Sequence, residues 1–376
     1  MHFWKNNTAA PTLFDTYFTK PGFMREGLPK QISSIVYDSD NNIIGSIYRL
    51  TKDNSISVAA FLEYNYNGDD WKLSNVIEWI DKYLMDPYTL VLGVISPSDV
   101  LLGTIFSVPV SSGTTKIDTG HELSHKSLRI IEGLCIDSSL RGKGIAGHLI
   151  SSIDYQTSLL FGNCVHLWSR ELPELPSPYF NTAINTATYA YKRCIEVDYP
   201  TDLKSVSWPT FVKLWNIMYD DFEEEEGSYI ISKISTNTRR GGISVFTSGD
   251  NKIVVVSDTC RTTTNTGIPH KSLNNINVPQ KIYEVIWCGK LVTTSLGTRL
   301  FPSVANDSYK HIINKITHKL NGILFVSTAL NGGCAKADWR TDGWHFGTSG
   351  HHCWYIYNFI VSAFGLVRLH IIHEEL

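Results

Sequence analysis

An apolar strand, a loop of glycines and basic residues, and a helix follow one another in the first half of the chain. Leu128–Ile136 is a long apolar run typical of a buried strand, and Gly144–Leu159 is predicted to form a helix. The loop before the helix contains Arg141, Gly142 and Lys143. Glycine lets the backbone approach a ligand closely, and a helix N-terminus directs N–H groups and its positive dipole end at an anion. This order predicts an anion site suited to a pyrophosphate.

This loop has two other interpretations, a turn without a ligand and a nucleotide-binding motif. A glycine-rich turn that holds no ligand remains the simple alternative. A dinucleotide fold or a P-loop fits less well, because the chain has no Gly-x-Gly-x-x-Gly here and no Lys-Ser or Lys-Thr pair follows the glycines.

Composition narrows the class of protein. The 376 residues are too many for one ordinary core, and a net charge of -3 gives no overall basic field for nucleic acid. The chain contains no run of ~20 apolar residues, so the sequence predicts no transmembrane helix. The 7 cysteines form no Cys-x-x-Cys pair, which favours reduced thiols. We expect a cytoplasmic protein without nucleic-acid partners.

Strand and helix patterns occur in both halves of the chain. The expected fold class is α+β, with residues 1–203 as one half and 204–376 as the other. Predicted strands cover Ile32–Tyr37, Ile43–Tyr48, Leu90–Ile95, Leu101–Val108, Cys164–Trp168, Ile243–Phe246, Lys252–Ser257, Ile282–Cys288, Gly322–Ser327, Tyr355–Phe359 and Leu366–Ile372, and predicted helices cover Val76–Leu84, Trp208–Phe222 and Asp307–Leu320.

The loop resembles the coenzyme A motif of the GNAT acetyltransferase superfamily. That motif is Arg-x-x-Gly-x-Gly/Ala, and here it would use Arg141, Gly144 and Ala146. In the superfamily the motif holds the pyrophosphate of coenzyme A.

Further segments resemble the glycylpeptide N-tetradecanoyltransferase (N-myristoyltransferase) family in particular. His2-Phe3-Trp4 resembles its Lys-Phe-Trp signature, and Glu132-Gly133-Leu134-Cys135-Ile136 its Asn-Phe-Leu-Cys-Val strand. Phe346-Gly347, Tyr355-Ile356-Tyr357-Asn358-Phe359 and Gly365-Leu366-Val367 resemble its C-terminal Phe-Gly, Tyr-Leu-Tyr-Asn-Trp and Gly-Leu-Val. The landmarks keep the family's order, and the sequence between them is strongly diverged. The chain therefore resembles a shortened, virus-like member.

The resemblance implies a fold, a reaction and its partners. The fold would be two fused acetyltransferase-like halves with pseudo-twofold symmetry, mixed sheets and flanking helices. The enzyme would act as a monomer without a metal and transfer myristate from myristoyl-CoA to the N-terminal glycine of a protein or peptide. Residues implied to hold the acyl-CoA are His2, Phe3, Trp4, Leu134, Cys135, Ile136, Arg141, Gly142, Lys143, Gly144, Ile145 and Ala146.

Main-chain amides are the implied oxyanion stabilisers. By position in the family strand these are the amides of Gly133 and Leu134, so their side chains need not match those of the family. Fixed backbone donors are worth a few kcal/mol each at a developing oxyanion. The alternative is that both amides are paired in a regular sheet, and a bulge at Gly133 would interrupt that pairing.

The proton acceptor has two candidates. In the family, the terminal carboxylate accepts the proton, and here that group belongs to Leu376, beyond extra residues that follow the Gly-Leu-Val segment. Glu132 is the second candidate, because it replaces the family's asparagine beside the reaction centre; the alternative is a surface carboxylate. Ser169 stands where the family has a threonine that bonds the amine, or it is an ordinary strand serine.

Peptide binding would involve a loop and several tyrosines. Tyr66, Asp69 and Asp70 lie in a shortened version of the family's acidic loop, whose carboxylates would attract a basic peptide; the two aspartates also suit a plain turn. Tyr189 and Tyr357 match family tyrosines.

Two further functions remain open. One is an acetyltransferase that uses a short acyl-CoA, and the other is a degenerate protein that binds acyl-CoA or peptide without catalysis. A histidine-rich stretch is interpreted as loop or groove residues rather than a metal site; it contains His345, His351, His352 and Cys353.

Overall fold

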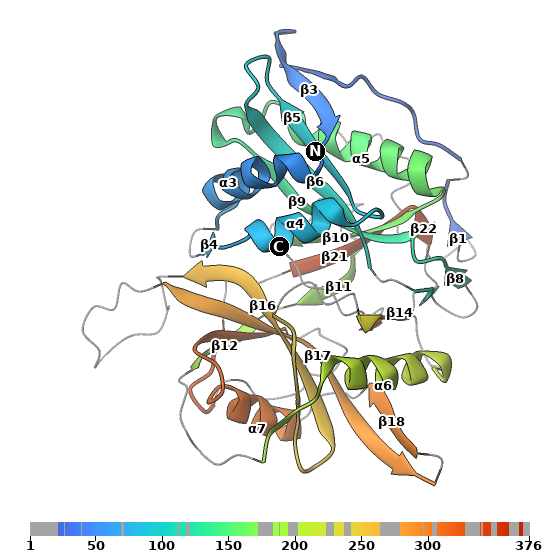
Figure 1. Ribbon diagram of the computed structural model, residues 1–376, viewed down its shortest axis with the longest axis vertical. Helices are drawn as coiled ribbons and strands as arrows, with labels where there is room; N and C mark the ends of the chain where they lie inside the picture. Colours follow the sequence, from blue (N-terminus) through green and yellow to red (C-terminus); the bar gives the residue numbers. More distant parts are fainter. Residues whose placement is uncertain are drawn as a thin grey trace.

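The protein is described by a computed structural model, and Figure 1 shows two sheets, one above the other along the long axis. The structure describes residues 22–25, 27–38, 40–68, 71–110, 113–117, 121–171, 183–187, 189–194, 202–222, 229–236, 242–263, 279–295, 297–302, 307–327, 339, 341–346, 352–360 and 368–370. Among these residues, no helix is both long and apolar enough to cross a membrane.

The first sheet has eight strands and forms the upper part of the molecule in Figure 1. Its third and fourth strands, in the order given next, pair in parallel, and its other pairs are antiparallel. In order across the sheet the strands are β11 (Ala183–Ala187), β21 (His352–Tyr357), β10 (Val165–Glu171), β9 (Leu128–Ile136), β6 (Leu101–Pro109), β5 (Leu90–Ile95), β3 (Ile43–Arg49) and β2 (Ile35–Tyr37).

Helices cover both faces of this sheet because successive strand residues point to opposite sides. Leu90, Leu92 and Val94 of β5 share a buried cluster with α5 (Ile145–Phe161). Val91 packs instead with α3 (Ser55–Asn65) and α4 (Ile77–Met85). Because helices cover the sheet on both faces, both sides of β5 are buried, which explains why its sequence is a continuous apolar run.

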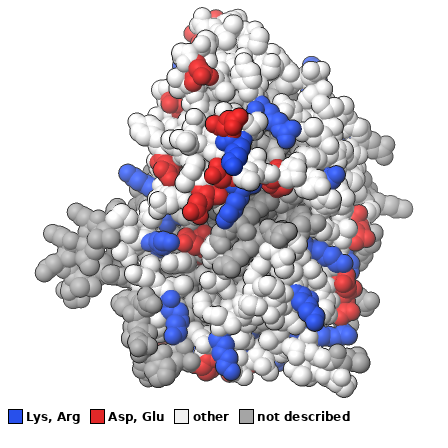
Figure 2. Space-filling view, viewed as in Figure 1, with Lys and Arg blue, Asp and Glu red and all other residues white. Residues whose placement is uncertain are grey.

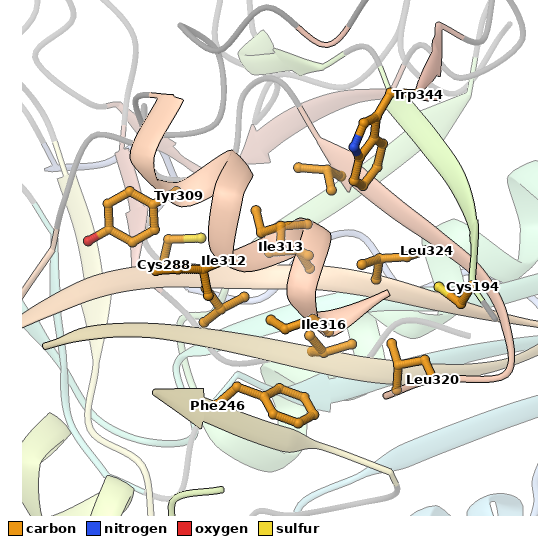
Figure 3. Close-up of a cluster of buried hydrophobic side chains, with 14 of the residues drawn as sticks. Cys194, Phe246, Cys288, Tyr309, Ile312, Ile313, Ile316, Leu320, Leu324 and Trp344 are labelled. Atoms are coloured by element: carbon orange, nitrogen blue, oxygen red, sulfur yellow. The ribbon is translucent and has the colours of Figure 1, made fainter. Parts of the chain in front are cut away.

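The second sheet has nine strands and is packed in the same way. Val254 and Val256 face α7 (Asp307–Ile316), whose isoleucines fill the cluster in Figure 3. Val255 faces α6 (Trp208–Asp220) on the other side. The main path runs β13 (Lys204–Ser205), β15 (Ser244–Thr247), β16 (Lys252–Thr263), β17 (Gln280–Thr294), β19 (Gly322–Ser327), β12 (Tyr189–Cys194) and β20 (His345–Phe346), while β18 (Gly297–Pro302) pairs with β17 and β4 (Lys72–Leu73) with β16.

The two sheets repeat one plan, strand for strand. In each, the parallel pair lies between antiparallel neighbours, and a helix lies between its two strands in the sequence: β9–α5–β10 in the first and β17–α7–β19 in the second. The correspondence continues outwards on both sides with the same orientations, as β6 with β16, β5 with β15, β3 with β13, β21 with β12 and β11 with β20. The expected α+β fold of two acetyltransferase-like halves is confirmed.

Each sheet receives one strand from the other half of the sequence. β21, from near the C-terminus, pairs with β10 in the first sheet. β12, which precedes residue 203, pairs with β19 in the second sheet. The chain therefore crosses between the sheets on both sides of the expected boundary, so neither sheet is built from 1–203 or 204–376 alone.

The strands and helices predicted from periodicity are found, with ends that differ by a few residues. The helix α3 was missed, because its apolar side chains lie all round and give no one-sided pattern. Two small sheets were also missed: one pairs β1 (Gly22–Phe23) with β22 (Phe359–Ile360), and the other orders β23 (Arg368–His370), β14 (Tyr229–Ser232), β7 (Thr115–Ile117) and β8 (His121–Leu123).

Candidate functional site

A β-bulge interrupts β9 at the two residues whose amides were singled out. Cys135 pairs with Thr104 and Glu132 with Phe106, so Gly133 and Leu134 together oppose the single residue between Thr104 and Phe106. Gly133 has a φ of 58°, a left-handed conformation that glycine adopts without a Cβ clash. The Thr104 hydroxyl donates to the Gly133 carbonyl at 2.9 Å and fixes the bulge from β6. Thr104 was not predicted, because a lone strand threonine carries no signal.

On its other side, β9 separates from β10 at the same level. The parallel pairing joins Leu128–Ile131 to Val165–Trp168 and does not extend past the pair of Ile131 with Trp168. Beyond it β10 continues only with β21, where Ser169 opposes Trp354. The bulge therefore lies where β9 and β10 diverge, and the regular strand-to-strand hydrogen bonds of β9 are interrupted toward both β6 and β10.

Glu132 and Ser169 border this divergence. Glu132 is half-buried and lies next to the bulge, and its role as the base stays a prediction. Ser169 is half-buried on the first residue of β10 beyond the parallel pairing. The structure thus brings these two predicted residues to the same level of the sheet as Gly133.

The glycine-bearing loop leads directly into α5. Gly142 and Gly144 have φ values of 84° and 82°, and Gly144 is the N-cap residue of the helix. Both are exposed, and a Cβ built on either would meet nothing within 4 Å, which leaves the backbone open to an approaching ligand. Lys143 is exposed between them. The first N–H groups of a helix lack intrahelical partners, so the loop has the geometry expected of an anion site.

Buried residues fasten this loop region to the sheet. Ile145 is buried at the start of α5, Ala146 is half-buried after it, and Ile136 and Leu134 pack against the same core. Cys135 points to the opposite face of β9, into the core under α3 and α4. Burial raises the pKa of the Cys135 thiol to about 12, so it is not a thiolate nucleophile at neutral pH.

The guanidinium of Arg141 bonds two backbone carbonyls. Its Nε donates to Ile136 at 3.2 Å, and Nη2 donates to Asn65 at 3.0 Å. Asn65 is the last residue of α3, so Arg141 places a positive charge at the negative end of that helix. The role of Asn65 was not predicted, because a carbonyl contact leaves no mark in the sequence.

Tyr66 follows Asn65 and leads into a turn that reaches the second sheet. Its ring meets Trp71 edge-on, with centroids 5.6 Å apart. The Gly68 amide donates to the Trp71 carbonyl at 3.1 Å, which closes the turn, and Lys72–Leu73 then pair with β16. Asp69 and Asp70, which stand between Gly68 and Trp71 in the sequence, lie outside the described residues.

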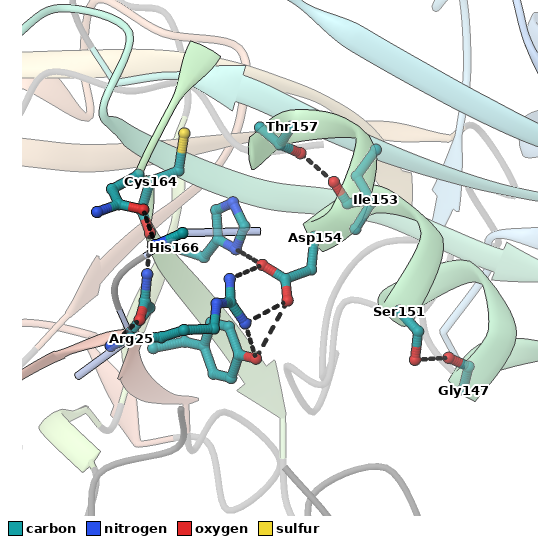
Figure 4. Close-up of polar contacts among 12 residues, drawn as sticks. Arg25, Gly147, Ser151, Ile153, Asp154, Thr157, Cys164 and His166 are labelled. Atoms are coloured by element: carbon teal, nitrogen blue, oxygen red, sulfur yellow. Dashed lines mark hydrogen bonds and ion pairs between the residues drawn. The ribbon is translucent and has the colours of Figure 1, made fainter. Parts of the chain in front are cut away.

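Figure 4 shows a polar cluster around Arg25, Asp154 and His166, and the buried Tyr357 makes contacts with it. Its hydroxyl bonds Asp154 at 3.2 Å, and its ring stacks on His166 with centroids 6.0 Å apart. Arg25 donates to both Asp154 oxygens at 3.0 Å. Burial is the main cause that lowers the pKa of His166, to about 4. The cluster joins the N-terminal arm (residues 22–25) to α5, β10 and β21. A peptide contact for Tyr357 stays a prediction.

Several predicted residues cannot be placed. His2, Phe3, Trp4 and Leu376 lie outside the described residues, and Tyr189 is described only as the first residue of β12, opposite Ser327. Within the described part of the chain, no three His, Cys, Asp or Glu residues converge as metal ligands; His351 lies outside that part.

The arrangement of strands and helices gives the class of fold first. The plan β9–α5–β10 in the first sheet, repeated as β17–α7–β19 in the second, defines a double α+β fold. No family model matches the sequence, and no curated protein matches it.

Solved structures identify the particular fold. A structure of Saccharomyces cerevisiae N-myristoyltransferase with bound myristoyl-CoA and inhibitors matches with a TM-score of 0.60 and 15% identity over 96% of this chain and 89% of that one. A second structure of the yeast enzyme with bound myristoyl-CoA matches with a TM-score of 0.58 and 14% identity, over 95% of this chain and 92% of that one. The chain therefore has the N-myristoyltransferase fold, at a sequence identity too low to fix its substrates.

Proposed function

We propose that the protein is a glycylpeptide N-tetradecanoyltransferase, which transfers a myristoyl group from myristoyl-CoA to the N-terminal glycine of a protein or peptide. The observation that carries this proposal is the bulge at Gly133 and Leu134, beside the divergence of β9 and β10 and upstream of the glycine loop. The fold of the whole chain, shared with an enzyme solved with bound myristoyl-CoA, supports it.

The loop and helix would bind the donor. Amides at Gly144 and the start of α5 would hold the pyrophosphate of coenzyme A, and the exposed ammonium of Lys143 would add a charge-assisted contact. Strand β9 leads from Gly133 to this loop, so the thioester would lie at the bulge when the phosphates lie at the helix.

At the bulge, the Gly133 and Leu134 amides would bond the thioester oxygen as it becomes an oxyanion. The glycine amine attacks the carbonyl carbon, the C–S bond breaks, and the coenzyme A thiolate leaves. Transfer would be direct, because the buried Cys135 thiol, with its pKa of about 12, is no nucleophile. Such amides need no reorganisation during the reaction and are worth a few kcal/mol.

A base must take a proton from the glycine ammonium before it attacks. Glu132 is the candidate that the structure describes, half-buried and one residue before Gly133. Ser169, across the divergence, would orient the amine. The terminal carboxylate of Leu376 remains the other candidate. Tyr66, Asp69, Asp70, Tyr189 and Tyr357 would contribute to peptide binding.

Mass spectrometry of an acceptor peptide tests the activity. A peptide with N-terminal glycine, incubated with acetyl-CoA and myristoyl-CoA together, should show the mass increase of a myristoyl group and not that of an acetyl group. The same peptide with N-terminal alanine, or with a blocked amine, should stay unmodified. Preference for acetyl-CoA would instead assign a short-chain acetyltransferase. Binding of myristoyl-CoA without release of coenzyme A would assign a non-catalytic protein.

A further inference from the structure

Arg141 belongs to the proposed donor loop, yet its described hydrogen bonds lead away from that loop. Both go to backbone carbonyls, at Ile136 on the end of β9 and at Asn65 on the end of α3. One planar guanidinium thus joins the strand that bears the bulge to the helix that precedes the Tyr66 turn. A cation at a helix C-terminus is also favourable, because it meets the negative end of the dipole.

From Asn65 a short chain of contacts reaches the second sheet. The Tyr66 amide donates to Leu62 at 2.8 Å, which continues α3 into the turn. The Tyr66 ring packs against Trp71, and the guanidinium of Arg261 lies over the Trp71 ring at 4.6 Å from its centroid.

Main-chain bonds reinforce this connection. Leu73 and Lys72 pair with Arg261 and Thr262 of β16. The Ser74 amide donates to the Cys260 carbonyl at 3.0 Å. The segment between α3 and α4 is therefore fixed at one end by Arg141 in the first half and at the other by β16 in the second.

We propose that Arg141 is a positioning residue that couples the donor loop to the acceptor side of the site, through Asn65 and the Trp71–Arg261 contact. This inference rests on the proposed function for the nature of the two ligands. A change at Arg141 should alter residues 66–68 and 71–73 and, through them, the affinity for the acceptor peptide. Coupling of this kind is reciprocal, so acceptor binding changes donor affinity by the same factor.

An alternative role makes a different prediction. If Arg141 served only as a phosphate ligand, replacing it would weaken donor binding and leave the acceptor affinity of the donor-saturated protein unchanged. Arg141→Lys separates the two roles: it keeps the charge for a phosphate but loses the planar fork that bonds two carbonyls. Arg261→Lys is the matched change at the other end, where it weakens stacking on Trp71 and keeps the charge.

Binding measurements test the coupling in the full chain. Calorimetry would titrate an N-terminal glycine peptide into protein saturated with a non-hydrolysable myristoyl-CoA analogue, and separately the analogue into protein alone. We expect Arg141→Lys and Arg261→Lys each to raise the peptide Kd about fivefold, with a change below about twofold in the analogue Kd. Because both act on one segment, the double variant should also lose about fivefold rather than the product of about 25-fold. Lys213→Ala, at an exposed position on α6, is the control.

Hydrogen exchange tests the structural link without any ligand. Amides of residues 66–68 and 71–73 should exchange about fivefold faster in Arg141→Lys than in the wild type, while α7 and β19 stay unchanged. Unaltered exchange in this segment, an unaltered peptide Kd, or losses that multiply in the double variant would overturn the coupling. If the wild-type protein binds neither ligand, the proposed function fails, and the exchange result still decides whether Arg141 holds the segment.

Discussion

The two sheets share their strand order, and they differ at the point where a site would be expected. In each, parallel pairing ends and a bulge follows within three residues: after Ile131 in β9, and after Val285 in β17, where the register shifts at Ile286. The first half has Gly133 at a positive φ there. The second has Trp287, fully buried against α6. The two halves therefore share the place of the bulge and differ in its residues, a glycine at positive φ in the first and a buried tryptophan in the second.

The sequences before the two corresponding helices also differ. α5 begins after exposed Gly142, Lys143 and Gly144, whereas residues 303–306, which precede α7 in the sequence, include no glycine and no basic residue. This difference is the reason why the proposed function places the donor in the first half. Surface charge does not separate the two halves in this way on the face shown in Figure 2, where acidic and basic side chains are interspersed.

The largest expected effect comes from closing the bulge of the first half. Gly133→Val places a β-branched residue at a φ of 58° and should force the backbone away from this geometry. Loss of the oxyanion donors would lower kcat about 100- to 1,000-fold. Ile286→Val, at the bulge of the second half, should leave kcat unchanged. Steady-state kinetics with circular dichroism to verify folding would measure both, and equal losses would remove the distinction between the halves.

Acid should weaken the first half before the second. His166 is buried on β10, two residues before the last parallel pair of the first sheet. The same position on β19 of the second sheet is held by Leu324, which does not titrate. The folded-state pKa of His166 is about 4 against an ordinary value of 6.5, so between these values the unfolded chain is protonated and the folded protein is not. The free energy of unfolding should therefore fall as pH falls from 6.5 to 4, by about 3 kcal/mol in total.

Asp154 on α5, Arg129 on β9 and Arg25 on the N-terminal arm are the charged groups around His166. Urea denaturation at steps of pH would measure the slope, and His166→Gln should flatten it. Hydrogen exchange at acid pH should show β9 and β10 opening while β17 and β19 stay protected. Simultaneous opening of both sheets would contradict the account.

Glu132 has Ile286 as its counterpart, the residue after the last parallel pair. Glu132→Gln should lower kcat about 100-fold if the carboxylate is the base, with little change in the Kd of a myristoyl-CoA analogue. Deletion of residues 370–376 is the matched test of the terminal carboxylate. Full activity of Glu132→Gln would exclude Glu132 as the base.

The smallest expected effect is at the donor loop. Lys143→Ala removes one exposed charge beside the start of α5 and should raise the Kd for coenzyme A about fivefold, more at low salt than at high salt. Calorimetry at two salt concentrations would measure it, with Lys315→Ala at the end of α7 as the second-half control. Equal effects of the two changes would show that the loop contributes no specific site.

Much of this could be predicted from the sequence because it depends on local patterns. The apolar run of β9 and the glycines at 142 and 144 each leave a direct mark in the sequence. The helix α3 could not be found, since its apolar residues lie on every side. The carbonyl contacts of Arg141 and the exchange of β12 with β21 depend on pairings between distant segments, which no local pattern records.

A crystal structure with a non-hydrolysable myristoyl-CoA analogue tests the central claim most directly. The account predicts the carbonyl oxygen of the analogue about 3 Å from the amides of Gly133 and Leu134, with the pyrophosphate at the start of α5. A carbonyl placed away from β9, or a donor bound at β17 and α7, would contradict it.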